Sequence, residues 1–380
     1  MARAATLAGA LLVGGALLAG TPAAIPAGGA TATGSDLHAA LRAATQDVQV
    51  MVLKGSCGGD CQADLVARVT AAGCDQVRLF PTLRMASARG RAAARQAGAS
   101  AWGVDRVNQA ALPLDGKTST ACYPARGAGV TVYVLDTGIA TGHAQFQGRA
   151  SGVVAPGAPY ASAADEDGHG SHVAGTVAGA TTGVAPAATI VGVRCLDANG
   201  GGRIVDVLSA IEYVAAVKAA KPGAKVVLNA SLGTDRADGS PWTAAANRAN
   251  NVGVIVVVAA GNEPVSACRN HPAQAAGAIS VAALTREDML ASFSARGTRC
   301  VAVSAPGVRI LSVNAKTSSG LTSLSGTSMA APHVAGLAAL VLAEDPAGGS
   351  LRRDEVLRRI TRGAPTVGQY PMAWANPTCA

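Results

Sequence analysis

Short runs of Val, Ile, Leu and Ala recur along the chain from residue 130 onward, and stretches with helical periodicity lie between them. The runs are apolar on both faces, which is typical of strands in a parallel sheet that is covered on both sides. We expect strands at residues 130–136, 189–197, 225–231, 254–261 and 278–283, and helices at about 170–180, 203–221, 241–251 and 328–343. This alternation predicts an α/β domain with a central, mostly parallel sheet and right-handed crossovers.

The N-terminal region follows a different pattern. An apolar run from Leu7 to Leu18 comes after Arg3, and Ala30-Thr31-Ala32 fits the small-x-small rule of a secretory cleavage site. Residues 1–32 therefore predict a signal peptide. A membrane anchor is the alternative, but the run is short and broken by glycine, and no other stretch reaches about 18 uninterrupted apolar residues. We expect a secreted, extracellular protein with no membrane span in its mature form.

Residues 33–95 predict a small α+β unit that precedes the main domain. Within it, residues 48–54 alternate like a strand, residues 60–73 have the pattern of an amphipathic helix, and residues 76–80 form a second strand. We interpret this as a βαβ-like unit. The polar, basic and small residues at 86–101 predict a linker.

Composition narrows the class of the main domain, which we place at residues 96–380. Almost half of the chain is apolar but only 3% is aromatic, so the core must be aliphatic. The net charge of +8 is modest, and no basic stripe is interleaved with aromatic residues, so we expect no nucleic acid partner. Eight cysteines fit an oxidising compartment, and they lack the paired C-x-x-C units or His partners of a zinc site, which favours disulfides.

Polar residues stand at the carboxyl ends of the predicted strands, where parallel sheets bind their ligands. Asp136 ends the first strand, Ser231 ends the third, and Asn262 follows the fourth. His169 and Ser328 stand where two helices begin. An Asp, a His and a Ser at one edge indicate nucleophilic catalysis, because a serine hydroxyl needs a base and the base needs a carboxylate to orient it.

These residues also have simpler interpretations. Ser328, within "LSGTSMAAPHVAG", could be a helix N-cap, since serine is common at that position. The "DTG" at residues 136–138 also opens the loop of aspartic proteases, but that chemistry needs a second copy, which the chain lacks. His172 and His333 lie inside apolar helical stretches, and we interpret both as packing residues.

Four blocks of the sequence resemble those of the subtilisin-like serine peptidases, and the proteinase K branch is the most similar. They are "VYVLDTGIA" (132–140), "DGHGSHVAGT" (167–176), "VVAAGNE" (257–263) and "GTSMAAPHVAG" (326–336). The likeness covers about residues 101–345, and the chain order Asp, His, Ser is that of subtilisin. The resemblance implies a subtilisin-like three-layer fold and a serine endopeptidase that hydrolyses peptide bonds through an acyl-enzyme.

Applied to this chain, the resemblance implies a triad of Asp136, His169 and Ser328. It also implies that Asn262 and the Ser328 backbone N–H stabilise the oxyanion. The walls of the pocket for the residue before the cleaved bond would be Ser231, Leu232, Gly233, Ala259, Ala260 and Gly261, and their small apolar character favours a hydrophobic residue there. Gly200, Gly201 and Gly202 would pair with an extended substrate backbone. The alternatives are a turn residue for Asn262 and a flexible loop for the three glycines.

The resemblance also bears on partners and cofactors. Many secreted members carry an inhibitor-like propeptide, and residues 33–95 resemble its first half, while its second helix and last strand are missing before Trp102. We expect protein or peptide substrates, the chain's own propeptide as a partner, a monomer, and no required cofactor. This branch commonly binds calcium through a carboxylate, but the chain has Ala302 at that position, so we predict no metal site.

The resemblance places a disulfide between Cys268 and Cys300, where some relatives have a bridge. For the other cysteines the sequence leaves the pairing open: Cys57 with Cys61 would close a tight loop, Cys122 with Cys379 would join the ends of the mature domain, Cys74 has no assigned partner, and Cys195 fits a buried free thiol inside a strand.

Two other functions compete with the peptidase. A non-catalytic binding protein that kept the fold would be marked by the loss of a triad residue, and all three are present. An esterase of the α/β-hydrolase type requires a G-x-S-x-G elbow, and "GTSMA" lacks the final glycine.

Overall fold

The computed structural model describes residues 52–53, 74–80, 85–90, 101–118, 123–346 and 349–375. The chain forms two compact units, Met1–Ala97 and Gly98–Ala380. The expected ends of the signal peptide and of the propeptide stay predictions.

Seven parallel strands form the central sheet of the larger unit. They are β4 (Val130–Asp136), β5 (Ala150–Val154), β6 (Thr189–Arg194), β7 (Lys225–Ala230), β8 (Ile255–Ala259), β9 (Ala278–Leu284) and β10 (Val303–Pro306). Their order across the sheet is β10-β9-β8-β7-β4-β6-β5. The chain crosses over β4 between β6 and β7, so the strand order reverses beside β4. Open parallel sheets bind ligands at such a switch point.

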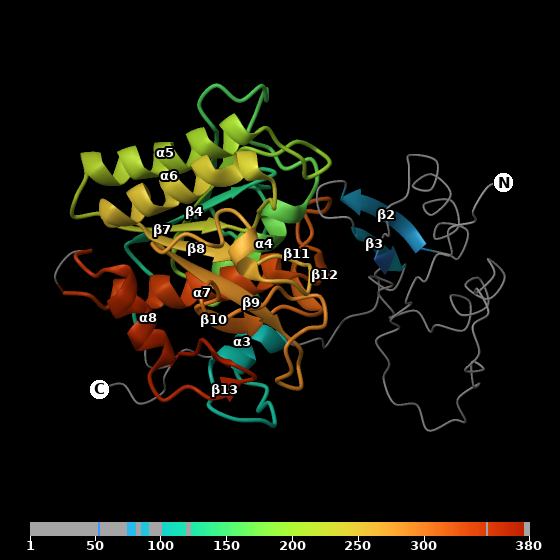
Figure 1. The fold of residues 1–380 in the computed structure, drawn as a ribbon, viewed down its shortest axis with the longest axis vertical. Helices are drawn as coiled ribbons and strands as arrows, with labels where there is room; N and C mark the ends of the chain where they lie inside the picture. Colours follow the sequence, from blue (N-terminus) through green and yellow to red (C-terminus); the bar gives the residue numbers. More distant parts are fainter. Residues whose placement is uncertain are drawn as a thin grey trace, which may run out of the picture. The chain divides into compact units, whose positions relative to one another are not determined.

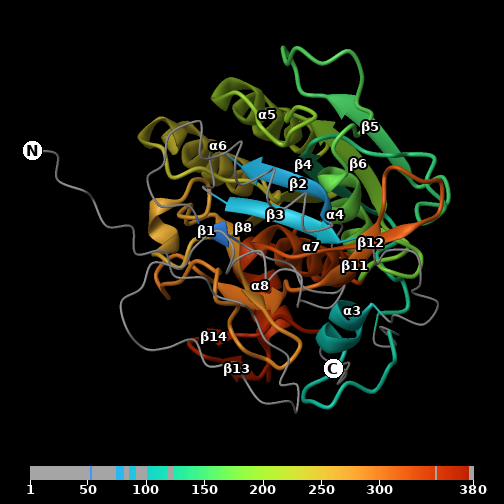
Figure 2. The same ribbon diagram turned by 90° about the vertical axis from the view of Figure 1, so that its right-hand side faces the viewer.

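Helices cover both faces of this sheet (Figure 1). On one face lie α5 (Ile204–Ala220) and α6 (Ser240–Asn251), and on the other lie α4 (His169–Ala178) and α7 (Thr327–Ala343). The 90° view in Figure 2 separates the same layers. None of the described helices is long and apolar enough to span a membrane.

Shorter elements complete the unit. They are α3 (Trp102–Val107), α8 (Arg353–Thr361), the 3-10 turns η2 (Ala237–Gly239) and η3 (Ala267–Arg269), and the hairpins β11 (Ile310–Val313) with β12 (Leu321–Leu324) and β13 (Thr366–Val367) with β14 (Tyr370–Pro371). The first hairpin packs on α4, and α8 packs on α7.

The alternation of side chains along β4 decides which face receives the candidate aspartate. Tyr133 and Leu135 belong to the aliphatic cluster under α5 and α6. Val132 and Val134 are fully buried on the opposite face. Because successive side chains of a strand point to opposite faces, Asp136 shares the face of Val132 and Val134, which is the face covered by α4 and α7.

The predicted α/β class is confirmed, and each predicted strand and helix of the larger unit is present. Within the central sheet, the sequence pattern does not predict β5 and β10, and outside it the pattern does not predict α3, α8 or the two hairpins. Strand β5 lies at the sheet edge and exposes Ser151 and Gly152, so it lacks a continuous apolar run. Strand β10 has only four residues at the other edge.

The smaller unit contains a three-stranded sheet in the order β1 (Val52–Leu53), β3 (Met85–Gly90), β2 (Cys74–Phe80). The predicted linker at 86–101 was wrong in its first part, because β3 is the central strand and pairs antiparallel with both neighbours. Strands β1 and β2 run in the same direction with β3 between them, and the βαβ-like unit itself stays a prediction. Pairing on both sides stabilises a strand whose small, polar residues carry little intrinsic β preference. The helix expected at 60–73 lies outside the described residues.

A disulfide joins Cys268 in η3 to Cys300, which is 32 residues further along the chain. Cys195, directly after β6, is buried and free. Cys57, Cys61, Cys122 and Cys379 lie outside the described residues, and Cys74 is described by its backbone alone, so the other pairings stay predictions.

His333 and His172 are both buried in helices, as expected for packing residues. Burial lowers the pKa of His333 to about 4, although its Nδ1–H donates to the Met329 carbonyl at 2.8 Å. The folded-state pKa thus lies below the unfolded value of 6.5, so protons bind preferentially to the unfolded chain. The stability held above pH 6.5 is lost as the pH falls toward 4.

We predict that His333→Gln weakens this pH dependence. In the wild type, this residue alone should lower the free energy of unfolding by about 2–3 kcal/mol between pH 7 and pH 4.5. In the glutamine variant this part of the acid-induced fall should be absent, because glutamine does not titrate. Urea unfolding of both proteins at the two pH values measures the difference. An equal acid-induced loss in both would mean that His333 is not held neutral.

Candidate active site

Asp136 and His169 meet where β4 ends and α4 begins. Asp136 is fully buried, and the Nδ1–H of His169 donates to Asp136 Oδ1 at 2.7 Å. The backbone N–H of Thr137 donates to the same oxygen at 2.8 Å. A carboxylate is an acceptor, so it fixes the proton on Nδ1 and leaves Nε2 as the basic nitrogen of the ring.

Glycine at position 170 allows α4 to begin this close to β4. A Cβ atom on Gly170 would lie 2.3 Å from the carbonyl oxygen of Gly138 and 3.0 Å from the Cβ of Asp136. Real side chains do not come so near. The short distance between the helix and the strand therefore requires glycine as the second residue of "HGSH".

A buried arginine holds the segment that precedes α4. Arg194 pairs with Asp136 in the sheet register, and its side chain is only 4% exposed. Its guanidinium donates to three backbone carbonyls, those of Ser162 at 3.2 Å, Ala164 at 2.9 Å and Leu196 at 3.4 Å. The planar donor fork thus attaches the segment before His169 to the end of β6.

The two terminal nitrogens of the same guanidinium also bind a carboxylate at the surface. They donate to both carboxylate oxygens of Glu166, at 3.2 and 3.0 Å. The interaction with Arg194 lowers the pKa of the exposed Glu166 carboxyl. The Arg194 guanidinium carbon also lies 4.7 Å from the ring centre of Tyr160, within the range of a cation–π contact.

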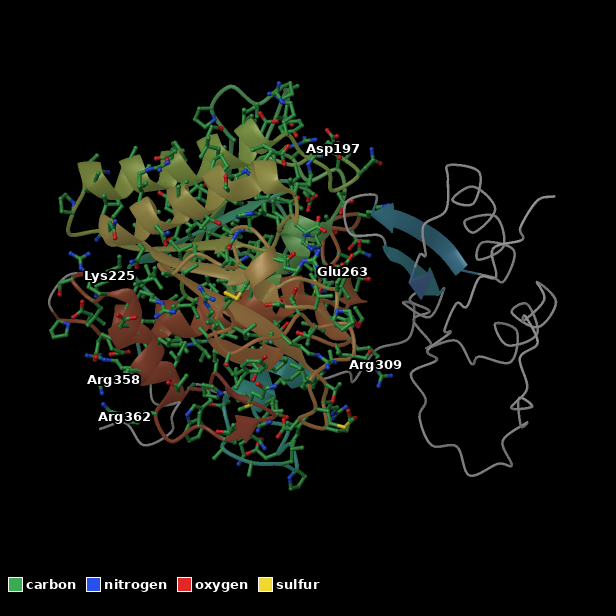
Figure 3. All side chains as sticks on the ribbon, in the orientation of Figure 1. Asp197, Lys225, Glu263, Arg309, Arg358 and Arg362 are labelled. Atoms are coloured by element: carbon green, nitrogen blue, oxygen red, sulfur yellow. A yellow bond between two sulfur atoms is a disulfide. The ribbon has the colours of Figure 1, made fainter. Side chains whose placement is uncertain are left out.

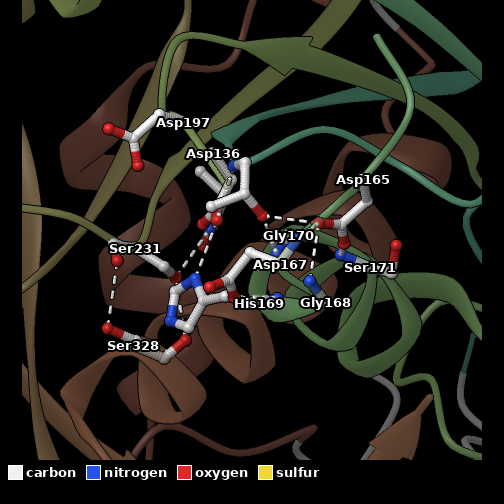
Figure 4. Close-up of polar contacts among 12 residues, drawn as sticks. Asp136, Asp165, Asp167, Gly168, His169, Gly170, Ser171, Asp197, Ser231 and Ser328 are labelled. Atoms are coloured by element: carbon white, nitrogen blue, oxygen red, sulfur yellow. Dashed lines mark hydrogen bonds and ion pairs between the residues drawn. The ribbon is translucent and has the colours of Figure 1, made fainter. Parts of the chain in front are cut away.

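Ser328 is the second residue of α7. Its Oγ–H donates to the Ser231 carbonyl at 3.0 Å, and the Ser231 Oγ–H donates to the Ser328 carbonyl at 2.8 Å. Gly326 occupies the N-cap position of α7, which has no side-chain cap bond. The alternative interpretation of Ser328 as an N-cap is therefore wrong. Figure 4 places the His169 ring between Asp136 and Ser328.

The side-chain amide of Asn262 is oriented by Thr327. Its Oδ1 accepts from the backbone N–H and from the Oγ1–H of Thr327, both at 2.8 Å. The Nδ2 group of Asn262 therefore points away from Thr327. A point at the Cβ position of Gly326 would lie 3.5 Å from Asn262 Nδ2 and 3.6 Å from the Ser328 nitrogen. Two N–H donors thus flank one small space at the start of α7, where the helix dipole favours negative charge.

The predicted substrate-binding residues also gather at this edge. Ser231, Leu232 and Gly233 follow β7, while Ala259, Ala260 and Gly261 end or follow β8, and these two strands are neighbours. Leu232 is half-buried against the cluster under α5 and α6. In Figure 3, Asp197 and Glu263 lie on the side of the carboxyl ends, and Lys225, the first residue of β7, lies on the opposite side.

The glycines at 200–202 belong to a turn that Asp197 closes. Asp197 Oδ1 accepts the backbone N–H groups of Asn199 at 2.7 Å and Gly201 at 3.0 Å. The Asp197 backbone N–H donates to the Gly201 carbonyl at 2.7 Å. These bonds define one conformation for the segment that would lie beside a substrate.

The position where this family branch would supply a calcium-binding carboxylate has none, and the expected absence of a metal site stays a prediction. The residue there is Ala302, whose backbone N–H donates to the Ser280 carbonyl at 3.0 Å and whose methyl side chain offers no ligand. Within the described part of the chain, no group of three or more His, Cys, Asp or Glu side chains is placed to hold a metal ion.

Sequence reasoning overlooked Arg194 and Thr327. Nothing in the sequence pointed to Arg194, because a basic residue at the end of an apolar strand usually reaches solvent. Thr327 stands directly before the candidate serine, and its hydroxyl was not considered as an orienting group. Its role depends on the loop after β8 returning to the start of α7, where the Gly261 N–H also donates to Thr327 Oγ1 at 3.1 Å.

The chain is similar to known serine proteinases. The model of the peptidase S8 subtilase family matches residues 127–372. The extracellular serine proteinase of Thermus sp. (strain Rt41A) is 46% identical over 244 residues, which cover 63% of this chain and 56% of the relative. The alkaline serine exoprotease A of Vibrio alginolyticus is 42% identical over 244 residues, 64% of this chain and 43% of the relative. The chain thus spans about half the length of these curated relatives.

A solved structure supports the fold. The crystal structure of a cold adapted subtilisin-like serine proteinase is similar with a TM-score of 0.63 and 35% identity. The similarity covers 73% of this chain and 97% of that one. The subtilisin-like three-layer fold expected from the sequence is confirmed, while the assignment to the proteinase K branch stays a prediction.

We predict that Arg194→Lys destabilises the protein although it keeps the positive charge. Lysine cannot reproduce the planar fork, so the carbonyls of Ser162, Ala164 and Leu196 would lose donors. The free energy of unfolding should fall by about 2–4 kcal/mol. Urea denaturation measures the loss. As a matched control, Arg236→Lys alters an exposed pair with Asp238 and should leave the stability nearly unchanged. Equal stability of Arg194→Lys and the wild type would contradict the role given to the fork.

Proposed function

Because the chain belongs to the subtilase family, we propose that it is a secreted serine endopeptidase that hydrolyses peptide bonds in proteins through an acyl-enzyme. The observation that carries this proposal is the 2.7 Å hydrogen bond from His169 Nδ1 to the buried Asp136, with Ser328 on the other side of the same ring. Relatives named as extracellular serine proteinase and alkaline serine exoprotease support the assignment.

The reaction begins at Ser328. Its Oγ attacks the carbonyl carbon of the substrate while His169 Nε2 takes the hydroxyl proton, and Asp136 stabilises the imidazolium that forms. The hydroxyl first turns away from the Ser231 carbonyl, to which it donates in the absence of substrate. This rearrangement is small, since catalytic hydrogen bonds in free enzymes are often formed only on binding.

The negative charge on the substrate oxygen is the main barrier to this step. Asn262 Nδ2 and the Ser328 backbone N–H are fixed in place before the reaction, so they stabilise the oxyanion without reorganising. His169 then gives its proton to the leaving amine, and the acyl group stays on Ser328. Water attacks the acyl-enzyme by the same steps, and Ser328 regains its proton from His169.

Substrate would bind as an extended strand. We propose that its backbone pairs with the edge at Gly200, Gly201 and Gly202, where the bonds to Asp197 define the turn. The residue before the cleaved bond would enter between the segments 231–233 and 259–261. Both segments are small or apolar, which favours a hydrophobic residue there. We further propose secretion through residues 1–32, a propeptide at residues 33–95, and a monomeric mature enzyme.

The proposal is tested by combining variants of the triad. Ser328→Ala and His169→Ala should each lower kcat for a peptide amide by roughly 10⁶-fold, the scale of such losses in subtilisin. The double variant should be no worse than either single variant, because the residues act as a unit. Ser209→Ala, a hydroxyl lost from α5 on the opposite face of the sheet, is the control and should keep full activity.

Two results would argue against the proposal. Substantial hydrolysis by purified Ser328→Ala would move the nucleophile elsewhere. A wild-type chain that binds peptides but releases no product would favour the non-catalytic binding protein.

A further inference from the structure

The Asp165 carboxylate accepts four hydrogen bonds near the candidate triad. Its Oδ1 accepts the Thr137 Oγ1–H at 2.8 Å, the Gly168 N–H at 2.7 Å and the Asp167 N–H at 3.2 Å. Its Oδ2 accepts the Ser171 N–H at 2.8 Å. Both oxygens of this carboxylate are therefore occupied, and each partner is a donor (Figure 4).

The partners of Asp165 belong to two segments that are distant in the sequence. Thr137 directly follows Asp136 at the end of β4, whereas Gly168 and Ser171 lie on either side of His169 at the start of α4. A second link runs parallel to the first, because the Gly170 N–H donates to Thr137 Oγ1 at 3.0 Å. The carboxylate thus connects the residue after the aspartate to the residues that flank the histidine.

Asp165 contributes to the first turn of helix α4, where it accepts the Ser171 N–H, while Asp167 Oδ1 accepts the His169 N–H at 2.9 Å. The N-cap residue of α4, Gly168, has no side chain to accept a bond, and no residue in the first turn is acidic. The free N–H groups at a helix start need acceptors, and they favour negative charge. Asp165, three residues before the cap, supplies a negative charge and accepts the N–H groups of Gly168 and Ser171. Its added bond to Thr137 ties the start of α4, and so His169, to the end of β4.

We infer that Asp165 is a positioning residue, which sets the distance and angle between Asp136 and His169 without contacting substrate or the reacting atoms. The inference rests on the proposed function for its effect on rate. A displacement of about 1 Å in such a group can cost about 10²-fold in rate. The segment itself is attached to β6 through Arg194 and the Ala164 carbonyl, so Asp165 has a fixed support.

Two variants of Asp165 separate geometry from general destabilisation. Asp165→Asn keeps one oxygen for Thr137 and Gly168, but it turns an NH₂ group toward the Ser171 N–H. Asp165→Ala removes every contact. We expect kcat per folded active site to fall about 10-fold for asparagine and about 10²-fold for alanine, with KM within about three-fold of the wild type. Thr137→Val removes one partner and replaces the alanine variant if that protein does not fold.

The matched control is Asp354→Asn on α8, where the carboxylate is 86% exposed and pairs with Arg353. Its kcat and KM should equal those of the wild type. A second readout does not depend on activity. The proton on His169 Nδ1 should give a low-field ¹H resonance in the wild type and in Asp354→Asn, and this resonance should shift or disappear in the Asp165 variants.

The outcomes separate this inference from the proposed function. A lowered kcat with unchanged KM and an altered Nδ1 resonance supports the positioning role. An unchanged resonance, an unchanged kcat or a loss carried by KM alone overturns it. If the wild type has no peptidase activity, the resonance still tests whether Asp165 sets the contact between Asp136 and His169.

Discussion

The hydrogen bond between the buried Asp136 carboxylate and His169 is the contact on which the rest of the site depends. A carboxylate without solvent exposure is costly unless it accepts hydrogen bonds, and His169 and the Thr137 N–H both donate to its Oδ1, at 2.7 and 2.8 Å. This short contact requires α4 to begin against the end of β4, which is why residue 170 is a glycine. Hydrogen bonds from the start of α4 to Asp165 and Thr137 help to hold the helix at this distance from β4.

A second constraint comes from the start of α7, where the helix provides free N–H groups in apolar surroundings. Thr327 is fully buried and holds the oxygen of Asn262, so the amide nitrogen is directed to the space beside the Ser328 nitrogen. The two helices that carry His169 and Ser328 cover the same face of the sheet. The geometry of the candidate site is therefore a consequence of strand ends and helix starts that share one edge.

Most of the central sheet and the main candidate residues can be predicted from the sequence. Apolar runs predict the buried strands, and Asp136, Asn262 and Ser328 stand where those runs end or where helices begin. The pattern predicts a linker where strand β3 lies, because its residues have no apolar periodicity and the strand is defined by its pairing with β1 and β2. Asp165 has a partial signal, an acidic residue shortly before a helix start. Its bond to Thr137, however, depends on how two distant segments pack, and no local pattern encodes that.

A crystal structure of the protein after reaction with a peptidyl phosphonate would test the central claim most directly. We expect phosphorus bonded to Ser328 Oγ, one phosphoryl oxygen within about 2.7–3.1 Å of both Asn262 Nδ2 and the Ser328 nitrogen, and the His169–Asp136 hydrogen bond retained. The peptide should lie along residues 200–202. A label on another residue, or a phosphoryl oxygen directed to solvent with Asn262 turned away, would contradict the account.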